Sequence, residues 1–480
     1  MLLALIFVPL LGAALMPILR KLWSQGATVV TVLATAWLLA ITGWLAFHSS
    51  SRNFQFNQSV FGGMFSLQID GLSLVVLLAI SLVVMVTVVF AIGYPLDPDR
   101  RPGCYALLLL AVTGMDGLVM ATDLFSLYVF LEILSVSVFI LIAYQIDRNG
   151  LEGAFKYMML SAVATTLLLV AIALLFAMTG SVAFSELKKV GALSGTLGYQ
   201  LALALSVCAF ALKGGIMPFH GWLPDAYTGA PAPIAVFLGG IVTKVAGIYT
   251  LMRVIIAVFG FSKPFTSVLL FLAALSIILG SFFALGQKDF KRMLAFSSIS
   301  QIGYIVAGFA TGSVLGLLGA AFHFFNHAIF KSLLFLNAGS VESATGTRDF
   351  EKLGGLTQKM PIIGYTSIIA MLSTAGIPPL GGFWSKLLII MALWMTGYHL
   401  YAVIAVFAGV VTLAYLLSLQ RSVFFGKLKE GLENINEVAP VAYFPALLMA
   451  AITIAIGIAF PFVINKLILP VRAVLEMTVK

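Results

Sequence analysis

Apolar runs of about twenty residues follow one another along almost the whole chain. Of its 480 residues, 61% are hydrophobic and only 9% are charged, whereas about a quarter of the residues in a soluble domain are charged. A helix that crosses the hydrocarbon core of a bilayer needs about 20 apolar residues, and about fourteen runs meet this requirement. The sequence therefore predicts an all-α polytopic membrane protein that forms one membrane domain over residues 1–480.

Several other classes of protein are excluded. Cys104 and Cys208 lie in apolar runs about a hundred residues apart, which excludes a disulfide framework and a cysteine-based metal site. No P-loop, dinucleotide fingerprint or metal-ligand spacing is found, so no cofactor, metal or redox centre is expected in this chain. The net charge of +9 comes from basic residues scattered through short loops, so nucleic acid is not an expected partner. The first run begins at Met1 without a charged region or cleavage site and is expected to be retained.

Lysines and arginines divide unevenly between the two sides of the membrane. Fifteen of the 27 fall on the side reached after odd-numbered spans, and eight fall on the other side. The positive-inside rule then places the larger set in the cytoplasm and both termini on the outer side of the plasma membrane. Four lysines remain that no loop accounts for, namely Lys213, Lys244, Lys331 and Lys386.

Two of these lysines adjoin expected helix breaks. Lys213 lies in ALKGGIMPFHGW, where two glycines and Pro218 interrupt the seventh run, and Lys386 follows AGIPPLGG in the twelfth. Broken spans build ion sites in many transporters, although a simple proline kink also fits the first break. Because the two breaks are five spans apart, we expect two inverted five-helix repeats, over residues 103–258 and 264–421.

Two carboxylates also lie within expected spans. Glu132 is about nine residues into the fifth run, roughly 13 Å along a helix, and we expect it to pair with Lys213. Asp116, in TGMDGLVM, fits equally well as a second carboxylate, a sodium ligand or a helix-packing residue among glycines. A charge at the centre of the bilayer costs at least about 2.5 kcal/mol, so such groups are functional candidates. The alternative is that each lysine pairs with a carboxylate and only holds helices together.

A row of titratable side chains is expected farther along the chain. Lys244 lies midway along the eighth run and could continue a path from Lys213. In AFHFFNHAIFKSLLF, the side chains of His323, His327 and Lys331 recur every four residues, so a helix presents them as one stripe about 12 Å long. Histidine exchanges protons near neutral pH, and the stripe therefore suits a proton relay. The other interpretation of each histidine is a packed, hydrogen-bonded side chain.

The chain resembles the antiporter-like subunits of Mrp-type sodium/proton antiporters, respiratory complex I and membrane-bound hydrogenases. The resemblance rests on five segments that cover most of residues 121–390: ATDLFSLYVFLEIL, ALKGGIMPFHGWLPDAYTGAPAPIAVFLGGIVTKVAGIY, KRMLAFSSISQIGYI, FHFFNHAIFKSLLFLNAG and GIPPLGGFWSK. It implies fourteen spans, two inverted repeats, broken seventh and twelfth helices, and a charged axis at mid-membrane. DLFSLYVFLE and LPDAYTGAPAPI look most like the Mrp D-type branch.

Carried over residue by residue, the family's functional positions fall on titratable groups already singled out. The fifth-helix glutamate falls on Glu132, the seventh-helix lysine on Lys213 and the eighth-helix lysine on Lys244. The histidines of the second repeat fall on His323 and His327, and the twelfth-helix lysine falls on Lys386. Asp116 departs from the family pattern, where an uncharged residue is expected, and it leaves the choice between proton and sodium open.

The resulting hypothesis is a proton-translocating or sodium/proton-translocating subunit of a larger complex. Its expected partners are antiporter-like and small membrane subunits and, in an oxidoreductase, a peripheral redox module that carries the electron-transfer chemistry. The parent complex is an Mrp-type antiporter, a related hydrogenase or a complex I type NADH-quinone oxidoreductase. Two further hypotheses are a free-standing secondary carrier for a small solute and a passive scaffold for a redox module.

Overall fold

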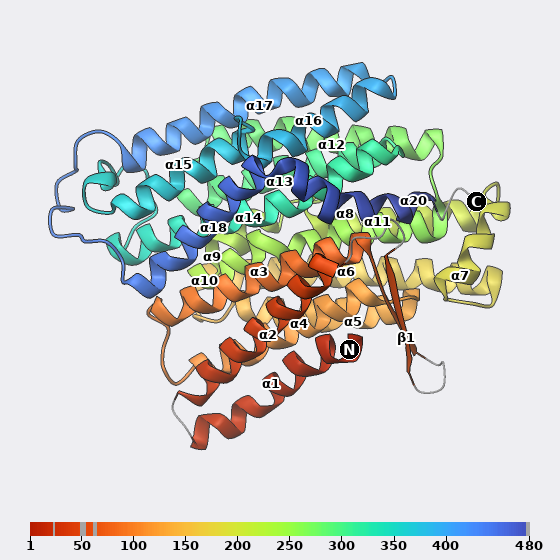
Figure 1. Cartoon of the computed structure of the whole chain (residues 1–480), viewed down its shortest axis with the longest axis horizontal. Helices are drawn as coiled ribbons and strands as arrows, with labels where there is room; N and C mark the ends of the chain where they lie inside the picture. Colours follow the sequence, from red (N-terminus) through yellow and green to blue (C-terminus); the bar gives the residue numbers. More distant parts are fainter. Residues whose placement is uncertain (23–24, 49–53, 61–64, 477–480) are drawn as a thin grey trace.

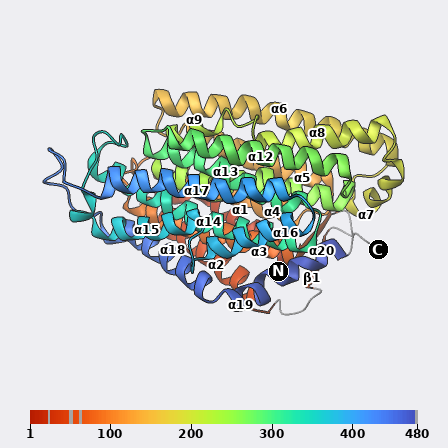
Figure 2. The same cartoon turned by 90° about the horizontal axis from the view of Figure 1, so that it is seen from above.

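Long helices run side by side along the molecule, and the loops gather at its two ends (Figures 1 and 2). The computed structural model describes residues 1–22, 25–48, 54–60 and 65–476. Within these residues, thirteen helices are long and apolar enough to cross a membrane, and two shorter apolar helices, Pro361–Ala375 and Gly381–Met395, follow one another. Counted as one broken span, this pair completes the fourteen crossings expected from the sequence.

The helices long enough to cross a membrane are α1 (Leu2–Leu22), α2 (Gly26–His48), α3 (Gly71–Gly93), α4 (Arg101–Met120), α5 (Leu124–Ile142), α6 (Arg148–Thr179), α8 (Leu197–Gly214), α12 (Lys263–Leu285), α13 (Phe290–Ala310), α14 (Val314–Thr345), α17 (His399–Leu419) and α18 (Pro440–Ile458). The eighth span, Ala232–Phe259, alternates α-helical with π-helical segments, the latter at Leu238–Val242, Lys244–Tyr249 and Ile255–Phe259. The short helices α7 (Phe184–Leu187), α9 (Leu223–Gly229), α19 (Phe460–Val463) and α20 (Arg472–Glu476) lie between or after the spans.

The centre of the bundle consists of α13, α14 and the eighth span. In their apolar windows 100%, 89% and 89% of the residues are buried, compared with 33% in α1, α2 and α6. Most of the polar sequence motifs lie on these central helices, so their titratable side chains are surrounded by protein and not by lipid. This placement lets neighbouring helices supply hydrogen-bond partners to groups that hydrocarbon could not solvate.

A two-stranded hairpin differs from the all-α expectation. β1 (Gln55–Val60) pairs antiparallel with β2 (Phe65–Asp70) at the end of the molecule where both termini lie (Figure 1). Leu67 and Ile69 are buried and alternate with less buried Ser66 and Gln68, the period-two pattern of a half-buried strand. The segment is too short and too polar to span a membrane, so it leaves the expected polytopic architecture intact.

The seventh span is broken where the sequence predicted, although nearer its end than its middle. α8 ends at Gly214, and Gly215 takes a left-handed conformation with φ of 65°. The freed backbone groups find side-chain partners: Trp222 Nε1 donates to the Leu212 carbonyl at 2.8 Å, and Met217 N donates to Ser276 Oγ at 3.0 Å. The chain then continues as α9. The break is therefore stabilised from inside the protein, as a break at membrane depth must be.

The twelfth span is broken in the same way. α15 (Pro361–Ala375) ends before Gly376, whose φ is 87°, and α16 (Gly381–Met395) resumes after five residues. Here Lys386 Nζ donates to the Thr374 carbonyl at 2.8 Å, and Asn326 Nδ2 donates to the Gly381 carbonyl at 3.2 Å. Lys386, a candidate functional residue, thus helps to stabilise the backbone at this break.

Two glycines set the distance between the seventh and eighth spans. A Cβ atom added to Gly247 would lie 2.2 Å from the Cα and N atoms of Gly214, which follows Lys213 directly. Such a distance is far inside van der Waals contact, so the two backbones touch only because Gly247 has no side chain. The position of Lys213 relative to the helix of Lys244 depends on this contact.

We expect Gly247→Ala to destabilise the protein, because its methyl group forces the two backbones apart at a typical overpacking cost of about 1–3 kcal/mol. Thermal unfolding of the purified protein in detergent measures the loss. Gly43→Ala is the matched control, because no atom lies within 4 Å of a Cβ added at that helical position. Equal unfolding temperatures for both variants would contradict the proposed role of the contact.

Candidate functional site

The four intramembrane lysines are buried, with 0–5% of each residue exposed. Among the described residues, none of the four lies within 4.0 Å of a carboxylate oxygen. Their ammonium groups instead donate to hydroxyl and backbone carbonyl oxygens. Within the described part of this chain, the four lysines are therefore held by hydrogen bonds and not by direct ion pairs.

Lys213, in the last turn of α8, reaches two serines on neighbouring helices. Its Nζ donates to Ser135 Oγ on α5 at 2.6 Å and also to Ser161 Oγ on α6. Glu132 lies about one turn before Ser135 and is only partly buried, and its charge acts on Lys213 through space. The structure therefore brings the expected pair into electrostatic reach, with Ser135 and not Glu132 in direct contact with the ammonium group.

Lys244 lies at the junction of two π-helical segments in the eighth span. Its Nζ donates to the Gly239 carbonyl at 2.5 Å, and the residue is fully buried. π-Helical turns occur frequently at functional sites, because the irregular backbone presents carbonyl groups that a regular helix would hide. The charge of Lys244 acts on His323, His327 and Lys331, so it links the two halves of the chain.

The expected stripe on α14 exists. The rings of His323 and His327 are nearly parallel, at an angle of 6°, with their centroids 6.1 Å apart. One turn further, Lys331 Nζ donates to Ser297 Oγ at 2.7 Å and to the Leu294 carbonyl at 3.0 Å, both on α13. Within the described residues, His323 Nε2 and both ring nitrogens of His327 have no protein partner. These nitrogens are therefore available to accept or donate a proton.

Lys386 lies at the end of this row. Besides its bond to Thr374, its Nζ lies 4.5 Å from the centroid of the Tyr304 ring, a cation–π distance. Ser385, its neighbour in the chain, contacts His323 Nδ1 through Oγ at 2.9 Å. Tyr304 in turn lies 5.8 Å from the His323 ring, centroid to centroid. Ser385 and Tyr304 thus connect the second helix break to the histidine pair.

Asp116 lies apart from this row. It is 3% exposed on α4, between Gly114 and Gly117, which both approach α5 closely. A Cβ added to Gly114 would meet Leu134 N at 2.8 Å, and one added to Gly117 would meet the Phe130 ring. These contacts fit the helix-packing interpretation of the segment, while the roles of second carboxylate and sodium ligand stay open.

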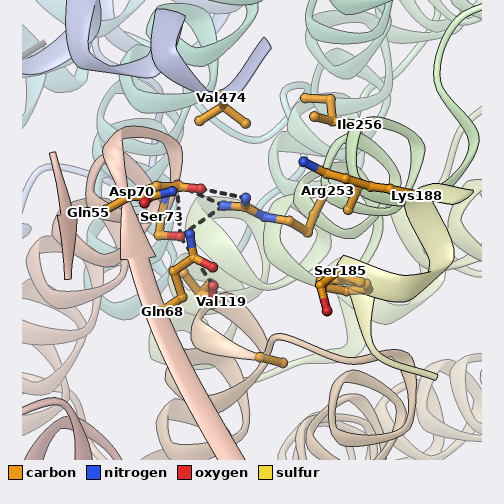
Figure 3. Close-up of a pocket in the computed structure, with 13 residues that line it drawn as sticks. Gln55, Gln68, Asp70, Ser73, Val119, Ser185, Lys188, Arg253, Ile256 and Val474 are labelled. Atoms are coloured by element: carbon orange, nitrogen blue, oxygen red, sulfur yellow. Dashed lines mark hydrogen bonds and ion pairs between the residues drawn. The ribbon is translucent and has the colours of Figure 1, made fainter. Parts of the chain in front are cut away.

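An ion pair that sequence reasoning missed lies near the end of the eighth span. Arg253, sorted from the sequence as a basic residue near a span end, donates to both carboxylate oxygens of Asp70 at 2.6 and 2.8 Å. Arg253 Nε also donates to the Tyr249 hydroxyl at 3.0 Å, and Tyr249 donates to the Val119 carbonyl at 2.6 Å. Figure 3 shows Asp70, Ser73 and Arg253 of this network beside a pocket of about 210 Å³, which Lys188 also lines.

Two partners stabilise the ionised form of Asp70, namely the Arg253 guanidinium group and Ser73 at the start of α3. Burial by itself raises the pKa of this carboxyl, but the charge of Arg253 and hydrogen bonds from Arg253 and Ser73 more than compensate, so the pKa is below its usual value. Its Oδ1 also accepts from Ser73 N at 2.9 Å and thereby caps α3. The signal in the sequence was an aspartate placed directly before a long apolar run.

We expect Asp70→Asn to lower the unfolding temperature at neutral pH, because breaking a buried pair leaves a buried charge and typically costs about 3–5 kcal/mol. The pair stabilises the fold above the ordinary pKa of aspartate, and this contribution is lost as the pH falls through the lower folded-state value. Thermal unfolding should therefore show a nearly constant wild-type advantage from pH 8 to about pH 5, which shrinks only as the pH falls below about 4. Exposed Asp99→Asn is the control, and the same profile in both variants would contradict the assignment.

The fold and the site together define a multi-pass membrane protein with a row of buried, titratable side chains between two broken helices. Residues 121–412 match the family described as NADH:quinone oxidoreductase/Mrp antiporter, TM. The chain belongs to this family, which confirms the resemblance seen in its motifs.

Similar proteins include components of antiporters and of respiratory enzymes. The chain is 34% identical over 389 residues to the D subunit of the Na(+)/H(+) antiporter of Alkalihalophilus pseudofirmus, a match that covers 81% of this chain and 78% of that protein. It is 37% identical over 321 residues to the N subunit of the NADH-quinone oxidoreductase of Desulforudis audaxviator, covering 66% and 64%. A chain of the membrane-bound sulfane sulfur reductase, an archaeal respiratory membrane complex, superposes with a TM-score of 0.89 at 28% identity, covering 99% and 98%.

Proposed function

We propose that the chain is the ion-translocating, antiporter-like subunit of a multisubunit membrane complex and that it moves protons along its buried row. The observation that carries this proposal is the series of titratable groups from the first helix break to the second. In their proposed order, the groups are Glu132, Lys213, Lys244, Lys331, His327, His323 and Lys386. The direct partners of the lysines are neutral oxygens and an aromatic ring, so none of the lysines is held in its charged form by a direct ion pair.

Electrostatic coupling gives the row a mechanism. Two unit charges about 7 Å apart, at an effective dielectric constant of about 20, repel each other by about 2 kcal/mol. Since about 1.4 kcal/mol corresponds to a tenfold change in a protonation equilibrium, a proton arriving at one group favours release from the next. The two histidines, placed between the lysines, pass the proton on through their ring nitrogens. A change in the distance from Glu132 to Lys213 would start or stop the series.

The two breaks support the proposed inverted repeats, over residues 103–258 and 264–421. Each repeat has one span that ends at a glycine of positive φ, continues through a short irregular segment and resumes as a helix. A buried lysine adjoins each break, Lys213 before the first and Lys386 after the second. Alternating access requires a gate in each half of the protein, and two helix breaks of similar construction at corresponding positions meet this requirement.

The proposed setting is the plasma membrane, with both termini on the outer side because the loops at the opposite end carry more lysine and arginine. The partners are other membrane subunits, as in the complexes of its relatives. Whether a second ion gradient or electron transfer drives the protons depends on those partners. A free-standing carrier is the second candidate; it should purify in active form alone, whereas one component of a complex should co-purify with further membrane proteins.

We expect Lys213→Met to abolish coupled proton transport while the complex still assembles, because the row then lacks its first cation. Transport is measured as proton movement into vesicles that contain the assembled complex, and assembly is measured by co-purification. Lys263→Met, at an exposed position at the start of α12, is the control and should transport normally. Undiminished transport by the Lys213 variant would refute the relay.

We expect Glu132→Gln to slow transport by about tenfold, because it removes the charge that acts on Lys213 through space. The same vesicle assay applies, with the exposed Glu152→Gln as its control. A passive scaffold predicts no change in either variant, so a silent Glu132 variant would favour that hypothesis over the relay.

A further inference from the structure

The helices α13 and α14 carry two rows of polar side chains that face each other. On α13, Ser297, Gln301 and Tyr304 are spaced by four and three residues, so they lie on one face of the helix. The facing row on α14 is the stripe of two histidines and one lysine described above. Every residue of both rows is fully buried. The proposed relay uses the row on α14, which leaves the function of the row on α13 to be explained.

Contacts at the two ends of the rows fix how they face each other. At one end, Lys331 Nζ donates to Ser297 Oγ at 2.7 Å. At the other end, the Tyr304 ring lies 5.8 Å from the His323 ring, centroid to centroid. The two helices are antiparallel neighbours, because only residues 311–313 join them. The two rows therefore run in opposite directions along the chain and meet residue by residue.

This pairing places Gln301 opposite His327. Gln301 lies one helical turn after the serine of the first contact, and His327 lies one turn before the lysine that this serine binds. Yet the two side chains do not bond to each other. Within the described residues, both amide atoms of Gln301, both ring nitrogens of His327 and Nε2 of His323 have no protein partner. Tyr415 of α17 lies beside Gln301, but its hydroxyl contacts Ser297 Oγ at 2.7 Å.

These five atoms define the ligand that they require. A buried polar atom without a partner costs about 1–3 kcal/mol, and nearly all such atoms in proteins have one. The charges of three buried lysines act on His327, and none of the five atoms belongs to a carboxylate, so a cation does not fit. An anion only accepts hydrogen bonds and leaves the amide oxygen of Gln301 unsatisfied. Water both donates and accepts, and it typically makes about three hydrogen bonds when buried.

We propose that Gln301 binds water between α13 and α14 and is a positioning residue for the relay. Its amide oxygen accepts from the water and its amide nitrogen donates to the water, while the ring nitrogens of His327 and His323 supply the remaining partners. A water with hydrogen bonds of about 2.8 Å on two sides joins atoms up to about 5.6 Å apart. Such a molecule can link two rings whose centroids are 6.1 Å apart.

The water completes a proton transfer that the two rings do not make directly. Protonated His327 gives its proton to the water, the water gives one of its own protons to His323, and the water molecule is regenerated. Gln301 is not itself protonated, because it only fixes the position and orientation of the water. This role in transport rests on the proposed function, whereas the water site itself does not.

An electron cryo-microscopy map of the purified, intact complex, at a resolution that shows ordered water elsewhere in the protein, tests the site. In chloride-free buffer, the wild type should show water density between the Gln301 amide and the His327 ring. Gln301→Met has an unbranched side chain of similar length without amide atoms, so it should assemble normally and lose this density. Absence of the density in the wild type, or density that appears only when chloride is present, overturns the proposal.

Proton transport into vesicles tests the positioning role. We expect Gln301→Met to slow transport by at least about tenfold, because the transferring groups lose their alignment. Gln301→Asn keeps the amide and leaves room for water, so it should recover most of the wild-type rate. Gln420→Met is the matched control. Gln420 is also fully buried and its Nε2 donates to Ser367 Oγ at 2.5 Å, so this variant loses a protein hydrogen bond and should still transport normally.

The outcomes separate this proposal from the relay. If Gln301→Met lacks the water but transports at the wild-type rate, or if Gln301→Asn is as slow as Gln301→Met, the positioning role is overturned. If Gln301→Met fails to assemble, the wild-type map and Gln301→Asn decide, and missing water or lost transport in Gln301→Asn overturns it. Normal transport by Lys213→Met refutes the relay and leaves the water density unaffected.

Discussion

The structure depends on one constraint, the cost of placing ammonium groups where no water can solvate them. The protein meets it by surrounding Lys213, Lys244, Lys331 and Lys386 with neutral oxygen atoms. Three of the four reach backbone carbonyls: Lys331 reaches that of Leu294 in the regular helix α13, whereas Lys244 and Lys386 reach carbonyls in a π-helical segment and at a helix break. Helix breaks and π-helical turns are therefore more than interruptions, because they place main-chain oxygens where a buried lysine needs them.

The lysines at the two helix breaks meet this constraint differently. At the first, Lys213 is held by hydroxyl groups of two neighbouring helices, with Glu132 acting through space. At the second, Lys386 is held by a carbonyl of its own broken span and by the face of Tyr304. A hydroxyl can rotate and exchange protons, whereas a carbonyl and a ring cannot. Lys213, at the first break, can thus rearrange its hydrogen bonds, whereas Lys386, at the second, is kept in place.

Much of this could be predicted from the sequence. The number of spans follows from apolar runs, the breaks from Gly215, Pro218 and Gly376, and the stripe on α14 from a four-residue spacing. What could not be predicted were the partners, because residues such as Ser135 look like ordinary members of apolar runs until the helices pack. The hairpin over residues 55–70 was missed because its two strands are short, and the ion pair at its end because the two members lie far apart in the chain.

The eighth span has a further consequence. A π-helical turn contains more residues than an α-helical turn, so its three π-helical segments shift the phase of every side chain that follows. Lys244 and Arg253 lie at different points along this span, and each meets a partner that its helical phase selects. Deleting a single residue between them would rotate Arg253 by about 100° and turn it away from Asp70. The helical phase of this span therefore links the position of the central lysine to the ion pair at the membrane edge.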